Sequence, residues 1–123
     1  GFLHSHSYTG NPLACSAALG TLSIFESDKV LKKNLILSKK INRLFSSLED
    51  LPISDLRNIG MIWAFELDSK ISIDKVLAYS LNKGVLIRPI DNTIYFMPPY
   101  CIKENEARQM IKVTREAILY ASA

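Results

Sequence analysis

The sequence has few of the residues that build covalent or metal-bound frameworks. It contains two cysteines in 123 residues, Cys15 and Cys101, which lie far apart without metal-ligand spacing. This scarcity excludes a disulfide-rich secreted scaffold and gives no sign of a cysteine zinc site. We therefore expect two free, buried thiols in a reducing compartment, which predicts a cytoplasmic protein.

The sequence also lacks a membrane-spanning run, a secretory signal pattern and a strong charge of one sign. The longest uncharged stretch, residues 7–25, contains Gly10, Asn11 and Pro12, so it predicts a turn and a buried helix rather than a span. No basic segment precedes an apolar run. The net charge is only +3, and the lysines of residues 29–43 alternate with aliphatic residues. That alternation predicts a solvated helix face and not a nucleic-acid interface.

What is present is clear periodicity of apolar residues. It predicts helices at 12–26, 28–48, 73–83 and 104–121, and strands at 56–67 (with a bulge at Gly60), 85–88 and 93–97. This order indicates an α+β (layered α/β) domain with a sheet of three to four strands and helices packed on it. The first helix is apolar nearly all round, so we expect it to be buried against another domain or subunit.

Arg88 is the most unusual position, because it interrupts the apolar stretch "VLIRP". A guanidinium there either binds a carboxylate, reaches solvent at the strand end or pairs with an acidic neighbour. A turn at Asp91–Asn92 places Arg88 and Tyr95 on one face of a hairpin, as direct or diagonal neighbours. Together they could form a carboxylate site with an aromatic wall, or a cation–π pair on the surface.

The opening loop carries a second group of polar residues. Hydroxyls at 5, 7, 8 and 9 precede the helix start at Asn11–Pro12, and hydroxyls beside a helix N-terminus suit a phosphate. A polar loop that only caps the helix is the alternative. His4 and His6 have no obvious third ligand, so we expect no metal site.

The sequence offers no catalytic centre of its own. It shows no Ser-His-Asp arrangement, no paired carboxylates and no lysine in an apolar, pocket-like context. One alternative is therefore a folded, catalytically empty domain that self-associates through its first helix. If it belongs to an enzyme, the reacting group lies elsewhere.

Three stretches, "HSHSYTGNPLACSAALGTL", "GVLIRP" and "IYFMPPY", resemble the C-terminal part of the class III, fold type I aminotransferases. The resemblance implies a piece of a longer, homodimeric enzyme that uses pyridoxal 5'-phosphate. The "IRP…IYFMPPY" combination is most similar to members that transfer an amino group from S-adenosylmethionine to a keto acid in biotin biosynthesis. Another class III member, acting on ω-amino acids, is the alternative.

The resemblance also implies roles for individual residues. Ser7 falls where the family places a threonine on the cofactor phosphate across the dimer interface, with His6 beside it. Ser5 falls against the substrate, Arg88 on the substrate carboxylate, and Tyr95 close to Arg88. Residues 1–27 would be the phosphate loop and a helix leading to the large domain, and residues 28–123 the small domain. The family's Schiff-base lysine is absent from this chain, which implies that the chain alone is inactive.

Overall fold

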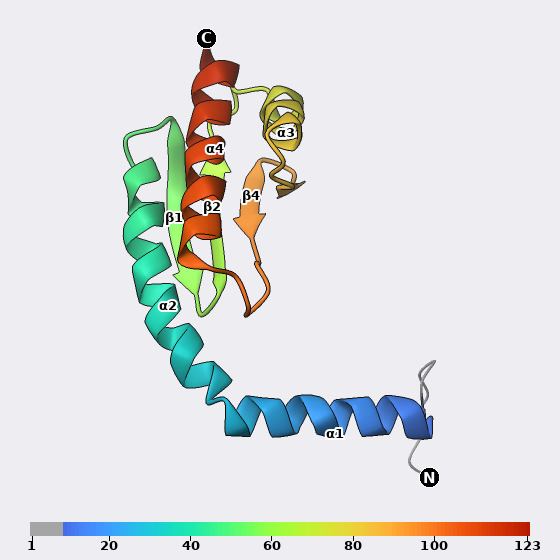
Figure 1. Ribbon diagram of the computed structural model, residues 1–123. Coiled ribbons are helices and arrows are strands. Elements are labelled where there is room, and N and C mark those ends of the chain that lie inside the picture. The colour runs from blue at the N-terminus through green and yellow to red at the C-terminus, as the bar shows by residue number, and fades with distance from the viewer. Residues whose placement is uncertain (1–8) are drawn as a thin grey trace. The chain divides into compact units, whose positions relative to one another are not determined.

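The computed structural model describes residues 9–123, and contacts divide the chain into two compact units, Gly1–Lys33 and Asn34–Ala123. The first unit contains α1, Pro12–Ser27 (Figure 1). It begins as predicted: the Asn11 side chain accepts hydrogen bonds from the amides of Leu13 at 3.0 Å and Ala14 at 3.2 Å. Among the described residues of this unit, none in α1 is buried, so the burial predicted for this helix is not seen here.

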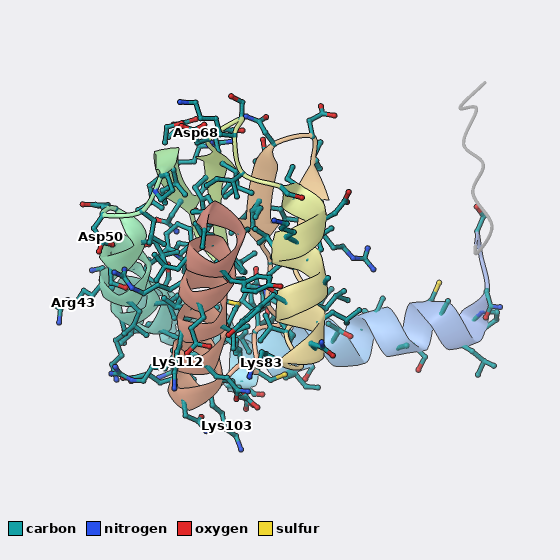
Figure 2. All side chains as sticks on the ribbon, turned by 90° about the horizontal axis from the view of Figure 1, so that it is seen from above. Arg43, Asp50, Asp68, Lys83, Lys103 and Lys112 are labelled. Carbon is teal, nitrogen blue, oxygen red and sulfur yellow. The ribbon has the colours of Figure 1, made fainter. Side chains whose placement is uncertain are left out.

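The helix α2, Val30–Phe45, continues into the second unit and ends in one 3₁₀ turn, η1, Ser46–Leu48. The predicted single helix to residue 48 thus tightens in its last turn. Ile41, Phe45 and Leu48 are buried. Arg43 points away from the sheet in Figure 2, as expected for a solvated face.

A four-stranded antiparallel sheet forms the centre of the second unit, with strand order β1-β2-β4-β3. The strands are β1, Ile53–Ile59; β2, Ile62–Leu67; β3, Arg88–Ile90; and β4, Thr93–Phe96. The helices α3, Ile73–Asn82, and α4, Glu104–Ser122, complete the unit. The predicted α+β class is confirmed.

The prediction of one continuous strand over residues 56–67 is wrong, because the chain turns at Gly60. Ile59 pairs with Ile62, so Gly60 and Met61 form a two-residue hairpin turn. Gly60 has φ +57°, a conformation that glycine adopts without steric cost. The true irregularity lies earlier, where one extra residue of β1 is accommodated between Ser54 and Arg57.

The prediction of a strand over residues 85–88 is also wrong, because β3 starts only at Arg88. The amide of Val85 donates to the Ser80 carbonyl at 2.9 Å, which ties this segment to the end of α3. The predicted start of α3 is confirmed: the Ser72 hydroxyl accepts from the amide of Lys75. The turn at Asp91–Asn92 is also confirmed, with Asp91 at φ +52°.

The two faces of the sheet differ in what covers them. One face carries the core, and the helices α2 and α4 lie over it in Figures 1 and 2. Phe45 contacts three aromatic rings of this core, with centroids 5.8–6.4 Å apart: Trp63, Phe65 and Phe96. The other face carries the alternate residues of the same strands, which are exposed or half-buried. We call it the open face, defined by Arg57, Ile59, Ile62, Ala64, Glu66, Arg88, Ile90, Thr93 and Tyr95.

Within residues 9–123, no helix is both long and apolar enough to span a bilayer. Cys15 and Cys101 are free but exposed, so the predicted burial of both thiols is wrong. Cys15 lies on α1, which has no buried residue, and Cys101 lies in the connection after Pro98–Pro99.

Candidate functional site

A single row of residues crosses the open face from one edge of the sheet to the other. Arg57 pairs with Ala64, Ala64 with Tyr95, and Tyr95 with Arg88. Because paired residues of adjacent strands point to the same face, all four side chains share that face. The row therefore has an arginine at each end, with one small and one aromatic residue between them.

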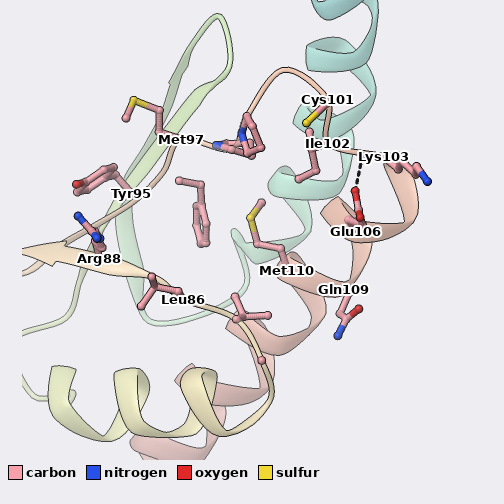
Figure 3. Close-up of a pocket in the computed structure, with 15 residues that line it drawn as sticks. Leu86, Arg88, Tyr95, Met97, Cys101, Ile102, Lys103, Glu106, Gln109 and Met110 are labelled. Atoms are coloured by element: carbon pink, nitrogen blue, oxygen red, sulfur yellow. Dashed lines mark hydrogen bonds between the residues drawn. The ribbon is translucent and has the colours of Figure 1, made fainter.

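Arg88 and Tyr95 are direct cross-strand partners, which selects the tighter of the two predicted hairpins. In Figure 3 their side chains lie together on one side of a hollow. Arg88 is exposed at the start of β3 and makes no ion pair with any residue in 9–123. The alternative prediction, that Arg88 pairs with an acidic neighbour, is therefore wrong. The cation–π contact found in this range joins Lys83 and Tyr79 instead.

Arg57, at the other end of the row, forms two ion pairs. Its Nη1 lies 2.6 Å from Oδ2 of Asp55 and its Nη2 lies 2.9 Å from Oε1 of Glu66. The Thr93 hydroxyl lies 2.8 Å from both oxygens of Glu66. The Thr93 hydroxyl, followed by Arg57, lowers the pKa of Glu66 below its ordinary value, because both donate to the ionised carboxylate. Sequence reasoning missed this network.

The hollow beside Arg88 is mainly apolar and has a volume of about 740 Å³. It lies between the connection from α3 to β3, the end of β4 and the first turns of α4. Apolar side chains line its middle: Val85, Leu86, Phe96, Met97, Pro98, Pro99, Ile102 and Met110. Polar residues close the side opposite Arg88, as Figure 3 shows: Lys103, Glu106 and Gln109. A guanidinium beside an apolar hollow suits a carboxylate that carries an aliphatic chain.

The remaining predicted site residues, Ser5, His6 and Ser7, lie outside the described residues, as does His4. Among residues 9–123, no group of three His, Cys, Asp or Glu side chains is placed to hold a metal ion. At the start of α1, the amides of Leu13 and Ala14 are already satisfied by Asn11. A phosphate near this helix would therefore depend on groups upstream of Asn11 rather than on these two amides.

Comparison with known proteins places these features in a family. A match to the family described as "Aminotransferase class-III" covers residues 2–118. The chain is 46% identical over 119 residues to the adenosylmethionine-8-amino-7-oxononanoate aminotransferase of Helicobacter pylori, covering 89% of this chain and 27% of that protein. It is 32% identical over 131 residues to the protein of the same name from Nitratidesulfovibrio vulgaris, covering 96% and 24%.

Solved structures agree with the sequence matches. The crystal structure of the adenosylmethionine-8-amino-7-oxononanoate aminotransferase of Methanocaldococcus jannaschii superposes with a TM-score of 0.88 at 33% identity. The match covers 99% of this chain and 31% of that one. The chain therefore spans between about a quarter and a third of the length of these relatives.

Proposed function

The chain belongs to the class-III aminotransferase family, and from that premise we propose that it forms the C-terminal part of an adenosylmethionine-8-amino-7-oxononanoate aminotransferase. The complete enzyme would transfer an amino group from S-adenosylmethionine to 8-amino-7-oxononanoate, giving 7,8-diaminononanoate for biotin biosynthesis. The names of the relatives at 46% and 32% identity support this choice over other members of the family. We further propose a cytoplasmic homodimer.

The observation that carries the proposal is Arg88, which lies beside an apolar hollow and has no ion-pair partner in the described part of the chain. The guanidinium would bind the substrate carboxylate through two parallel hydrogen bonds, with Tyr95 beside it. The aliphatic chain of the keto acid would lie along the apolar side chains of the hollow. Binding the carboxylate at a fixed point orients the reacting end of the substrate.

We propose pyridoxal 5'-phosphate as the cofactor of the complete enzyme. When bound, this cofactor carries the amino group between the two substrates and acts as an electron sink. The hydroxyl of Ser7, with His6 beside it, would contact the cofactor phosphate of the partner subunit, and Ser5 would face the substrate. Because Asn11 already satisfies the first free amides of α1, this proposal assigns the phosphate contact to the loop.

The proposal keeps the division of the chain suggested by the sequence. Residues 1–27 would be the cofactor-phosphate loop and the helix that leads to the large domain, and residues 28–123 the small domain. The chain alone would be inactive, because the lysine that the family uses to hold the cofactor would lie in the preceding part. Added pyridoxal phosphate should give no site-specific visible absorbance band with residues 1–123 alone.

A chimera tests the function directly. Residues 1–123 would replace the corresponding C-terminal part of the Helicobacter pylori relative. We expect the chimera to transfer an amino group from S-adenosylmethionine to 8-amino-7-oxononanoate. We expect Arg88→Ala to lower kcat/KM for the keto acid by a factor that corresponds to about 2–4 kcal/mol of lost transition-state stabilisation, because a charge-assisted bidentate contact is removed, with cofactor binding retained. Arg43→Ala, an exposed arginine on α2, is the matched control and should change kcat/KM little.

Two results would contradict the proposal. A folded chimera that uses ω-amino acids but not the named keto acid would assign the chain to another class-III activity. A chimera with full activity after Arg88→Ala would remove the carboxylate-binding role of this residue.

A further inference from the structure

The open face carries two arginines in one row, and among residues 9–123 only Arg57 has ion-pair partners. Arg57 and Arg88 stand at the two ends of a four-strand row. With strands about 4.8 Å apart, their Cα atoms are separated by roughly 14 Å. Flexible arginine side chains bring two guanidinium groups at this spacing within reach of both ends of a medium-length dicarboxylate. Such a dicarboxylate would lie across Ala64 and Tyr95 on the open face, outside the hollow, and would gain a second anchor unless Arg57 were blocked.

Glu66 is well placed to block Arg57. Its side chain is 22% exposed and lies 2.9 Å from Nη2 of Arg57. The Thr93 hydroxyl, from the neighbouring strand β4, lies 2.8 Å from both Glu66 oxygens and fixes the carboxylate in place. The two donors that lower the pKa of Glu66 also keep the carboxylate ionised, so the pairing persists at neutral pH.

Asp55, the other partner of Arg57, is a weaker block. Its side chain is 63% exposed, so water and salt screen its attraction to Arg57. The pair Asp55–Arg57 also lies within the irregular part of β1, whereas Glu66 lies inside the regular register of β2 with β4. An incoming carboxylate therefore competes more easily with Asp55 than with Glu66.

We infer that Glu66 is a specificity-determining residue: it occupies Arg57, leaves Arg88 as the one guanidinium of the row open to a carboxylate, and thereby selects monocarboxylates over dicarboxylates. Glu66 would give this selectivity by denying a dicarboxylate its second contact, the Arg57 guanidinium, and not by adding contacts to a monocarboxylate. The inference rests on the proposed function, because it takes Arg88 as the substrate-carboxylate site.

The test uses the full 123-residue chain, labelled with ¹⁵N, and two probes that differ by one carboxylate, octanoate and octanedioate. The side-chain Nε–Hε signals of Arg57 and Arg88 report directly which guanidinium each probe meets. In the wild-type chain, we expect both probes to shift the Arg88 signal and neither to shift that of Arg57. In Glu66→Gln, octanedioate should also shift Arg57 and bind about threefold to tenfold more tightly than in the wild type, while octanoate binding changes little.

Three further variants make the result specific. Arg57→Gln combined with Glu66→Gln should lose the gain in octanedioate affinity. Asp55→Asn removes the exposed partner and should give less than a twofold change. Thr93→Val loosens Glu66 without changing any charge, and should let octanedioate shift Arg57 to a smaller extent; it also provides a test if Glu66→Gln fails to fold.

The inference and the proposed function fail in different ways. The inference would be overturned if octanedioate did not shift the Arg57 signal in either Glu66→Gln or Thr93→Val. It would also be overturned if octanedioate shifted the Arg57 and Arg88 signals equally in the wild-type chain. A different result would contradict the proposed function alone. If neither probe shifted the Arg88 signal but octanedioate shifted the Arg57 signal in Glu66→Gln, then Glu66 would block Arg57 and Arg88 would not be the carboxylate-binding residue.

Discussion

The two faces of the sheet are built from the same strands but hold their side chains by different physical means. On the helix-covered face, Trp63 and Phe65 are completely buried and the alternation of apolar residues fixes their position. On the open face, alternate residues of the same strand contribute Ala64 and Glu66, and polar pairs decide which groups stay available. Burial of the apolar residues thus sets the register of the strands, and that register places the charged and polar side chains on the open face.

The largest effect should come from the covered face. Phe65→Ala removes a completely buried ring that packs against Phe45 and Phe96, and should lower the free energy of unfolding by about 3–5 kcal/mol. Ile62→Ala, on the open face of the same strand, is the control and should cost less than about 1 kcal/mol. Urea unfolding followed by Trp63 fluorescence measures both. Equal losses would contradict the assignment of faces.

The hairpin turn that sets the register should give the next effect. Gly60→Ala forces a side chain into φ +57°, and should destabilise the protein by about 1 kcal/mol. Gly20→Ala is a matched control in α1, where φ is not positive and the added Cβ meets nothing within 4 Å beyond its own stretch of helix, among the residues that the structure describes. It should stabilise the helix by about 0.5–1 kcal/mol. Thermal unfolding and helical circular dichroism distinguish the two signs.

The smallest effect concerns pH. Because the Thr93 hydroxyl and Arg57 lower the pKa of Glu66 in the folded chain, its contribution to stability is present above the unfolded value, 4.5, and is lost as the pH falls through the folded value. Glu66→Gln should therefore lower the melting temperature at pH 7, and the difference from the wild type should shrink below pH 4.5. A difference that is constant between pH 7 and pH 3 would show that Glu66 does not act as an ionised partner.

The covered face was predictable because it follows a simple period. Met61, Trp63, Phe65 and Leu67 alternate along the sequence, a pattern typical of one face of a strand, and all four residues are buried. The same alternation hid the turn, because Gly60 was interpreted as a bulge in a longer strand. Only the backbone conformation shows that the chain reverses there.

The open face was predictable only in part. Arg88 and Tyr95 were predicted to share a face from the short turn between them, and they are direct partners. The ion pair between Arg57 and Glu66 was not predicted, because it depends on a hairpin that the sequence pattern did not reveal. A two-residue turn at Gly60–Met61 puts Arg57 opposite Ala64 and diagonal to Glu66, so that turn is the signal that would have found them.

The most direct test of the account is the binding of octanoate to the 123-residue chain and to two variants, Arg88→Ala and Arg57→Ala, measured at low salt by chemical-shift titration. The account predicts that Arg88→Ala weakens binding about tenfold or more, because the open guanidinium is lost, and that Arg57→Ala leaves it nearly unchanged. Binding that survives Arg88→Ala, or that is lost equally in both variants, would contradict the claim that Arg88, and not Arg57, is the arginine of this row that is open to a carboxylate.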